Sequence, residues 1–439
     1  MKKRLVSLVA AAALLGSVSI ASAGTVTTKG DTNISIGGFI QTYFDWANNQ
    51  TNLGYQANPE YVVPAGQTTP EKNTPAQTSF GTSTQFSRIT LGLSNPTEGI
   101  TGVVEGDFFG GGAGEQLYGK GNFRLRHAYI VKEFCQEGCN YTPWLLIGQT
   151  WDPLEMLNSF TLNDIVGIAG QNWGEGVVRT SQIGFGVKFD LGSVKLNPGI
   201  YAANLAGDST FGNSGTVYFN PNNKGYSDYQ LSQRLTSPGF AFKLPVEFNT
   251  GFGSPASAYA GFEWQPMKLT NASADINSKN ENAWMATVGL TLPVYFVNLT
   301  GNFHYERGMT AFDMPLFGDT YAMPSFYIDS HGSVQEVRGT SWNAQAQIDF
   351  NKLAQVPVTF AFGYGQTVFS HYGDLADNIY TPLVRKMGTM FANVNYHLTK
   401  SLALGLEYDR NKTYYVGAGN DGSSGQNSNQ VFLRGMYSF

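Results

Sequence analysis

The chain has 439 residues, and its composition excludes the common soluble and helical membrane classes. Charged residues make up 13% of it, about half of the usual share, while aromatic residues make up 14%. A soluble helical protein would need more charge on its amphipathic faces. No run of about 18 apolar residues follows the N-terminal segment, which argues against membrane-spanning helices. The low charge, the aromatic residues and the 52 glycines favour a β-rich chain with short turns.

The first 23 residues are typical of an export signal. Lys2, Lys3 and Arg4 precede the apolar stretch 5–20, and Ala21-Ser22-Ala23 follows as a small-residue cleavage site. We expect a mature chain from Gly24; an uncleaved membrane anchor is the alternative. Loss of three basic residues leaves 24 against 32 acidic ones, a net charge of −8, which argues against a nucleic-acid partner.

The two cysteines, Cys135 and Cys139, are separated by three residues. In an exported protein this spacing favours a small disulfide across a turn, because the compartment is oxidising. A pair of free thiols is the alternative. Two thiols alone are too few for a zinc site, so we expect no metal and no cofactor.

Apolar and polar residues alternate along nearly the whole chain. Ile36, Ile40 and Phe44 fall on one face of the first segment, and Gln41 and Asp45 fall on the other. This period of two predicts strands with one apolar and one polar face. A soluble β-sandwich would alternate too, but strands of about 10 to 14 residues with aromatic residues at their ends favour a transmembrane antiparallel β-barrel.

The pattern predicts sixteen strands, an even number as a single-chain bacterial barrel requires. They are expected at 34–46, 85–94, 100–109, 123–133, 143–151, 177–190, 194–203, 237–249, 257–269, 282–293, 295–307, 334–350, 356–368, 385–398, 401–411 and 428–439. Short and long connections alternate, which predicts a turn side that carries both termini and a loop side opposite. The assignment within 226–257 is the weakest.

The last strand has apolar or aromatic residues at alternate positions and ends at Phe439. Such an ending is typical of the signal that the barrel assembly machinery of the bacterial outer membrane recognises. Together with the export signal and the strand count, it predicts an outer-membrane location and contact with outer-membrane lipid and lipopolysaccharide.

Five short motifs occur between residues 85 and 190. They are Ser87-Arg88-Ile89-Thr90-Leu91-Gly92, Glu105-Gly106-Asp107-Phe108-Phe109-Gly110, Arg124-Leu125-Arg126-His127-Ala128-Tyr129, Gly148-Gln149-Thr150-Trp151 and Arg179-Thr180-Ser181-Gln182-Ile183. In this order they resemble the DcaP-like outer-membrane porins. The resemblance implies a sixteen-stranded homotrimer that passes small organic anions, including dicarboxylates. The sequence departs from the family's type member in having no helical coiled-coil segment before the first strand.

Several charged residues share the face opposite the apolar rows, which in a wide barrel lines a water-filled lumen. They are Arg88, Glu105, Asp107, Arg124, Arg126, Lys132, Lys188 and Lys195. Pairing of neighbouring strands is expected to bring the first five together as a basic patch that attracts solute carboxylates. The alternative is that these charges only solvate the pore.

The third long loop, about 152–176, is predicted to fold into the barrel. It opens with Asp152-Pro153-Leu154-Glu155, which combines a helix N-cap, Pro at the first helical position and an acid three residues after the cap. A helix with Leu154, Leu157 and Phe160 would dock on the barrel wall, and Asp164 and Glu175 would face the basic patch. A loop that lies over the mouth of the barrel is the alternative.

His127 shares the parity of Leu125 and Tyr129, which places it on the outward face. A polar side chain against lipid is costly, so we expect it in a subunit interface of a trimer. A β-bulge that shifts the parity is the alternative.

These observations predict a porin for passive diffusion of small hydrophilic solutes, with a preference for organic anions such as carboxylates. A non-conducting structural barrel or a surface-interaction barrel is the alternative. The sequence contains no G-x-S-x-G, H-E-x-x-H or phosphate-loop motif, so we do not expect an enzyme.

Overall fold

The computed structural model describes the greater part of the chain. The described residues are 24–27, 31–48, 79–108, 122–135, 139–154, 159–162, 179–205, 216–220, 225–235, 237–271, 276–310, 323–329, 331, 333–373, 375, 382–417 and 420–439. Among them, no helix is both long and apolar enough to cross a membrane. The expected export signal lies outside this part of the chain.

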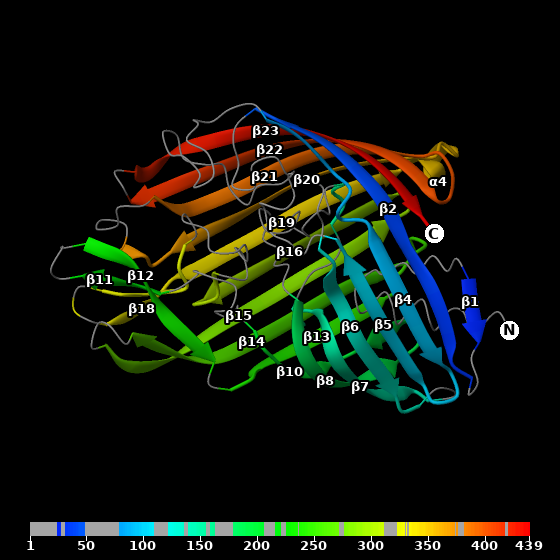
Figure 1. Ribbon diagram of the computed structural model, residues 1–439. Helices are drawn as coiled ribbons and strands as arrows, with labels where there is room; N and C mark the ends of the chain where they lie inside the picture. The colour runs from blue at the N-terminus through cyan, green and yellow to red at the C-terminus, as the bar shows by residue number, and fades with distance from the viewer. Residues whose placement is uncertain are drawn as a thin grey trace.

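Antiparallel strands make up nearly all of the described structure (Figure 1). They are β1 (Gly24–Thr27), β2 (Asn33–Ala47), β3 (Ser79–Ser83), β4 (Arg88–Asn95), β5 (Ile100–Asp107), β6 (Arg124–Glu133), β7 (Tyr141–Trp151), β8 (Arg179–Asp190), β9 (Val194–Leu196), β10 (Gly199–Ala203), β11 (Thr216–Asn220), β12 (Gly225–Leu235), β13 (Gly239–Phe248), β14 (Ala256–Asn271), β15 (Ile276–Val294), β16 (Val297–Arg307), β17 (Phe326–Ile328), β18 (Val334–Glu336), β19 (Arg338–Asp349), β20 (Val358–Ser370), β21 (Leu383–His397), β22 (Leu402–Gly417) and β23 (Asn420–Ser438). A short helix, α4 (Phe350–Ala354), lies in one turn and is capped by the Asp349 carboxylate, which accepts hydrogen bonds from the Asn351 and Lys352 N–H groups.

The sheet closes on itself as a sixteen-stranded barrel, which confirms the predicted fold class. The last strand, β23, pairs with β2, and Gly38 and Phe439 exchange backbone hydrogen bonds at the seam. Three of the sixteen wall strands are interrupted: β3 with β4 forms one, β9 with β10 forms another, and β12 with β13 forms a third. β1 pairs with the start of β2 below the point where β23 ends. Closure leaves no free sheet edge in the wall.

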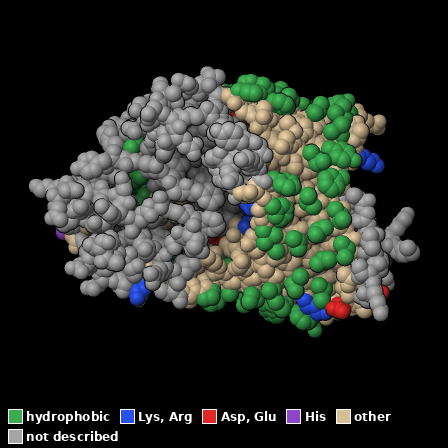
Figure 2. Space-filling model, in the orientation of Figure 1, with side chains coloured by type: hydrophobic (Ala, Val, Ile, Leu, Met, Phe, Trp, Pro, Cys, Tyr) green, Lys and Arg blue, Asp and Glu red, His purple; other side chains and the backbone are tan. Residues whose placement is uncertain are grey.

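Exposure follows the predicted alternation. In β2, Ile36, Ile40 and Phe44 are exposed on the outside, whereas Gln41 and Asp45 are buried inside. On the face shown in Figure 2, hydrophobic side chains are spread over the described outer wall, with few charges among them. The apolar outside and polar inside are those of a barrel that faces lipid and encloses a polar lumen.

The two ends of the barrel differ as expected. Both termini and α4 lie at the turn side, and β11, β12 and β18 lie at the other end (Figure 1). Several loops predicted there contain strands: β11 and β12 fall within 204–236, β14 and β15 extend into 270–281, and β22 and β23 extend into 412–427. Strand pairing needs only backbone groups, so it continues where the side-chain alternation that marks lipid-facing segments has stopped.

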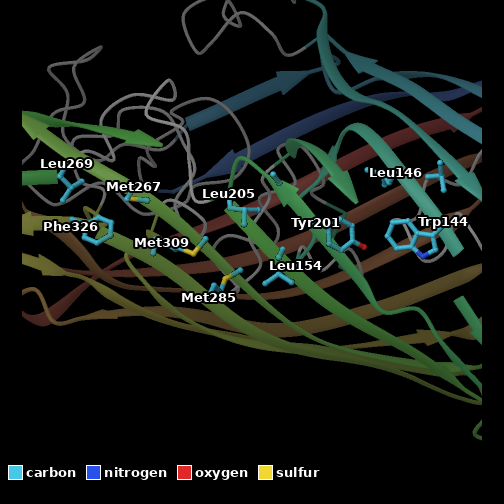
Figure 3. Packing of buried hydrophobic residues seen from close by; sticks show 14 residues of the cluster. Trp144, Leu146, Leu154, Tyr201, Leu205, Met267, Leu269, Met285, Met309 and Phe326 are labelled. Carbon is cyan, nitrogen blue, oxygen red and sulfur yellow. The ribbon is translucent and has the colours of Figure 1, made fainter. Parts of the chain in front are cut away.

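An apolar cluster lines the inner wall around β7, β10, β14 and β15 (Figure 3). The Trp144 ring packs against Gly184, Gly186 and Gly199. A Cβ atom on Gly186 would come within 2.4 Å of this ring. The indole N–H donates to the Asn197 Oδ1 atom at 2.6 Å. Leu154, from the start of the third long loop, packs into this cluster. The loop is therefore anchored inside the barrel at its first turn.

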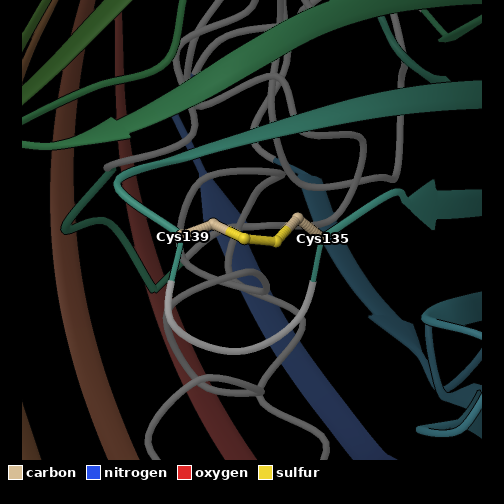
Figure 4. Close-up of a disulfide and its surroundings, with 2 residues drawn as sticks. All are labelled: Cys135 and Cys139. Carbon is tan, nitrogen blue, oxygen red and sulfur yellow. A yellow bond between two sulfur atoms is a disulfide. The ribbon is translucent and has the colours of Figure 1, made fainter.

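Cys135 and Cys139 are joined as a disulfide in the turn between β6 and β7 (Figure 4). Their Cα atoms are 6.4 Å apart, within the range for disulfides. The bond closes the connection between β6 and β7 on the turn side of the barrel.

Candidate functional site

A cluster of charged side chains lies on the inner wall of β4, β5 and β6. Register brings Arg88, Asp107 and Arg124 into one row across the three strands. Glu105 and Arg126 lie beside this row. The structure thus brings together the five residues that the sequence predicted as a basic patch.

The two carboxylates of this patch are held by arginines. Arg126 Nη1 lies 2.7 Å from Asp107 Oδ2, and its Nε lies 3.2 Å from Glu105 Oε1. Arg124 Nη2 lies 2.6 Å from Asp107 Oδ2, and Arg88 Nη1 is more distant, at 3.8 Å from Glu105. Arg126 and Asp107 are fully buried. Three arginines against two carboxylates leave the patch with a net positive charge.

A fourth arginine, Arg179, joins the patch at the start of β8. Its guanidinium carbon lies 4.1 Å from the centroid of the Trp151 ring, and that of Arg126 lies 5.7 Å from the same ring. The Nε and Nη2 atoms of Arg179 and the Nη2 atom of Arg126 are buried and have no hydrogen-bond partner within the described structure. These donors are suited to an anionic solute group.

The alternation rule missed Arg179. Its parity is that of Ser181 and Ile183, which are exposed on the outside. The residue is the first of its strand, where the chain leaves the regular wall, and contact with Trp151 decides its position. The sequence signal that could have identified Arg179 is the motif Arg179-Thr180-Ser181-Gln182-Ile183.

His127 differs from the prediction of an outward-facing interface residue. A bulge in β6 sets Glu105 opposite His127 and Gly106 opposite Leu125, so Arg126 is an additional residue. The His127 ring is buried inside, with Nδ1 3.1 Å from the Thr150 hydroxyl, and contacts Trp151 edge-on. The alternative of a parity-shifting bulge is the correct one.

The lysines lie apart from the arginine patch. The bulge also reverses the parity of Lys132, which shares the side of the exposed Ile130 and donates to the Glu98 carbonyl in a turn. Lys188 keeps the inward parity, but it pairs with Glu133 near the turn side. Lys195 pairs with Glu247 at 3.1 Å at the same end. Lys188 therefore has the predicted lumen-facing parity, but it lies apart from the arginine patch.

Residues 159–162 of the third long loop cross to the opposite wall, and we refer to them as the crossing segment. The Leu162 N–H donates to Glu407 Oε2 at 2.6 Å, and the Leu162 carbonyl accepts from Arg434 Nη1 at 2.9 Å. The Phe160 N–H donates to Gln345 Oε1 at 2.8 Å, and its carbonyl accepts from Asn393 at the same distance. Four wall strands, β19, β21, β22 and β23, thus hold this segment.

Apolar contacts reinforce the crossing segment. Phe160 packs against the buried Ala361 and Phe391, and a Cβ atom on Gly405 would come within 2.3 Å of the Leu162 side chain. At the start of the loop, Asp152 Oδ1 accepts from the Leu154 N–H at 2.9 Å, as in the predicted cap. Glu155, Leu157, Asp164 and Glu175 lie outside the described residues.

The wall that receives the crossing segment carries buried acids. Asp45 of β2 and Glu407 of β22 both lie opposite Phe432 of β23, and Asp409 lies two residues beyond Glu407. One oxygen each of Asp45 and Asp409 is buried with no hydrogen-bond partner in the described structure. Alternation predicts their polar face, and closure of the predicted barrel places the first and fifteenth strands on either side of the last. Within the described ranges, no set of three or more His, Cys, Asp or Glu side chains is placed to hold a metal ion.

Comparison with solved structures supports the architecture. The outer membrane channel DcaP of Acinetobacter baumannii superposes with a TM-score of 0.68 at 18% identity, over 94% of this chain and 99% of that one. The chain has a porin fold. An anion-selective porin from Comamonas acidovorans gives a TM-score of 0.52 at 15% identity, over 93% of this chain and 100% of that one. OmpF of Salmonella typhi gives 0.50 at 13% identity, over 95% and 100%.

The likeness to these porins is one of fold, because the identities are low. No protein-family model matches the sequence, and no curated protein matches it at a significant level.

Proposed function

We propose that the protein is an outer-membrane porin through which small hydrophilic solutes diffuse passively. A single observation carries the proposal: a closed barrel has an apolar outside and a polar inside, and its inner charges are unevenly distributed. Arginines gather on β4–β8, and further buried acids lie on β2, β14, β16 and β22. A structural barrel would need neither a polar interior nor unpaired donors within it. Assembly as a homotrimer and recognition through Phe439 belong to the same proposal.

We further propose a modest preference for organic anions such as carboxylates. Four arginines against two carboxylates give the patch a net charge of +2, and three of the buried donors have no partner. One neighbour in fold is described as an anion-selective porin, which agrees with this reading. Each contact is expected to be weak, because a solute that binds tightly would not leave the pore.

Planar-bilayer recording tests the proposal. The purified barrel is expected to insert and give discrete single-channel steps, with a reversal potential in a salt gradient that favours anions. The non-conducting alternative predicts folded protein with heat-dependent gel mobility but no steps. A cation-selective reversal potential would contradict the anion preference and leave the channel itself intact.

Replacement of Glu407 by alanine is expected to increase the single-channel conductance. The carboxylate fixes the Leu162 N–H on the far wall, so its loss should free the crossing segment to move within the lumen. Single-channel recording of Glu407→Ala against wild type measures the effect.

Asp409→Ala is the matched control for this prediction. It removes an acidic side chain two residues along the same strand, and within the described structure Asp409 forms no hydrogen bond with the crossing segment. Equal conductance changes in both variants would mean that charge alone, and not the position of the segment, is responsible.

A further inference from the structure

Four cationic residues stand on the outside of the barrel at the loop side. They belong to β16, β19, β21 and β22, which with β20 lie side by side in the wall (Figure 1). We call them the outer cationic belt, and its members are Arg307, Arg338, Lys386 and Lys412. None of them takes part in the lumen described above.

Parity places these side chains outside. In β16, Leu299 and Phe303 are exposed to the outside, and Arg307 has the same parity. In β22, the exposed row 402–408 continues to Lys412. Trp342 and Met390 give the outward parity in β19 and β21, to which Arg338 and Lys386 belong.

The four residues lie at one height. Each is ten or eleven residues from the turn-side end of its strand, a span of about 25 Å for strands tilted by about 40°. The spans run from Val297 to Arg307, from Arg338 to Asp349, from Lys386 to His397 and from Leu402 to Lys412. This span equals the height of the lipid-facing band of such barrels. The belt therefore lies at the upper edge of that band.

Aromatic rings lie at the same edge. The Lys386 and Lys412 ammonium nitrogens are 5.7 Å and 4.8 Å from the centroid of the Tyr414 ring. The Arg307 guanidinium is 5.8 Å from the Trp284 ring, which in turn contacts Tyr305. Tryptophan and tyrosine rings gather where acyl chains meet headgroups. The belt thus has cations at headgroup level and an apolar surface beneath them.

The belt keeps a net positive charge. Glu336 forms ion pairs with Arg307 and with Arg338, the latter at 3.4 Å, and so neutralises one of the two arginines. Within the described residues, Lys386 and Lys412 form no ion pair. The four cations and Glu336 sum to +3, and the outward Arg410, two residues below Lys412, adds one more positive charge. The described part of these strands carries no comparable set of outward acids.

We infer that the outer cationic belt binds the phosphate groups of lipid A in the outer leaflet. This inference rests on the proposed function, because it requires that the loop side faces the cell exterior. Lipid A offers two phosphates directly above several acyl chains, which matches cations directly above an apolar wall. A neutral or zwitterionic phospholipid would not compensate the charge of +3.

Lipid binding to the refolded, lipopolysaccharide-free barrel in detergent tests the inference. Native mass spectrometry would measure binding of bisphosphorylated lipid A and of phosphatidylethanolamine, with EDTA present so that divalent cations cannot bridge. Wild type is expected to bind lipid A at least tenfold more tightly. Lys386→Gln with Lys412→Gln is expected to lose most of this preference, and it breaks no ion pair of the structure.

Lys352→Gln with Lys400→Gln is the matched control, because these exposed lysines lie at the turn-side ends of the same group of strands. Heat-dependent gel mobility verifies that each variant is folded. Equal affinity of wild type for the two lipids, or an unchanged lipid A affinity in the Lys386 and Lys412 variant, would overturn the inference. Absence of conductance would instead overturn the channel proposal, since lipid binding is read out separately.

Discussion

Replacement of Arg126 by alanine is expected to destabilise the barrel by about 3–5 kcal/mol, the usual cost of removing one partner of a buried ion pair. The Arg126 side chain is fully buried and contacts both Glu105 and Asp107. Without Arg126, the arginine of the patch that still pairs with Glu105 is Arg88. Its Nη1 atom is 3.8 Å from Glu105 Oε1. Urea unfolding in lipid vesicles, followed by tryptophan fluorescence, measures the change in unfolding free energy.

Lys188→Ala is the control for this prediction. Lys188 also pairs with an acid on the inner wall, but both partners of the Lys188–Glu133 pair are about a quarter exposed. Water screens such a pair, so its loss should cost below about 1 kcal/mol. If both variants lose the same small amount, the arginine patch is a solvated pore lining and not a buried network.

Most of the barrel could be predicted because its physics is local. Lipid outside and water inside impose a period of two on every wall strand, and each predicted strand overlaps an observed one. The prediction failed where that constraint ends. Residues 277–281, by which β15 extends beyond the predicted strand, are all polar in sequence, so no alternation marks them, although β15 continues to pair with β14.

The site residues could be predicted where strand parity and the pairing of consecutive strands fix their positions. Arg88, Glu105 and Arg124 lie on consecutive strands, so turn lengths fix their register. His127 was misplaced because a single additional residue in β6 reverses parity, and no residue type signals a bulge. The meeting of the crossing segment with Glu407 could not be foreseen, because more than 240 residues separate the partners in the chain.

The crossing segment binds polar side chains of one lumen wall, and this affects which side chains a solute can meet. Glu407 and Arg434 bind the Leu162 backbone on that wall, where Asp45 and Asp409 are further buried acids. The opposite wall offers arginine donors. A solute carboxylate is therefore expected to pass along β4–β8, where Arg88 and Arg179 are the arginines least engaged with carboxylates.

These contacts determine which substitutions can test the ion selectivity of the pore. Arg124 and Arg126 are poor choices, because their removal would leave Asp107 buried without its partners. Lys188→Gln with Lys195→Gln is a suitable control, since it removes two inner-wall charges near the turn side. It leaves the arginine patch intact.

Arg88→Gln combined with Arg179→Gln is expected to shift the pore from anion preference toward cations. Each arginine is expected to contribute on the order of 1 kcal/mol to anion passage, which corresponds to about fivefold in the permeability ratio at low salt. The two acids of the patch keep Arg124 and Arg126, so the folded barrel should persist while the patch loses its net positive charge. Reversal potentials across a salt gradient measure the shift, which should fade near 1 M salt as the Debye length falls to about 3 Å. An unchanged reversal potential, or an equal shift in the lysine control, would show that this patch does not set the selectivity.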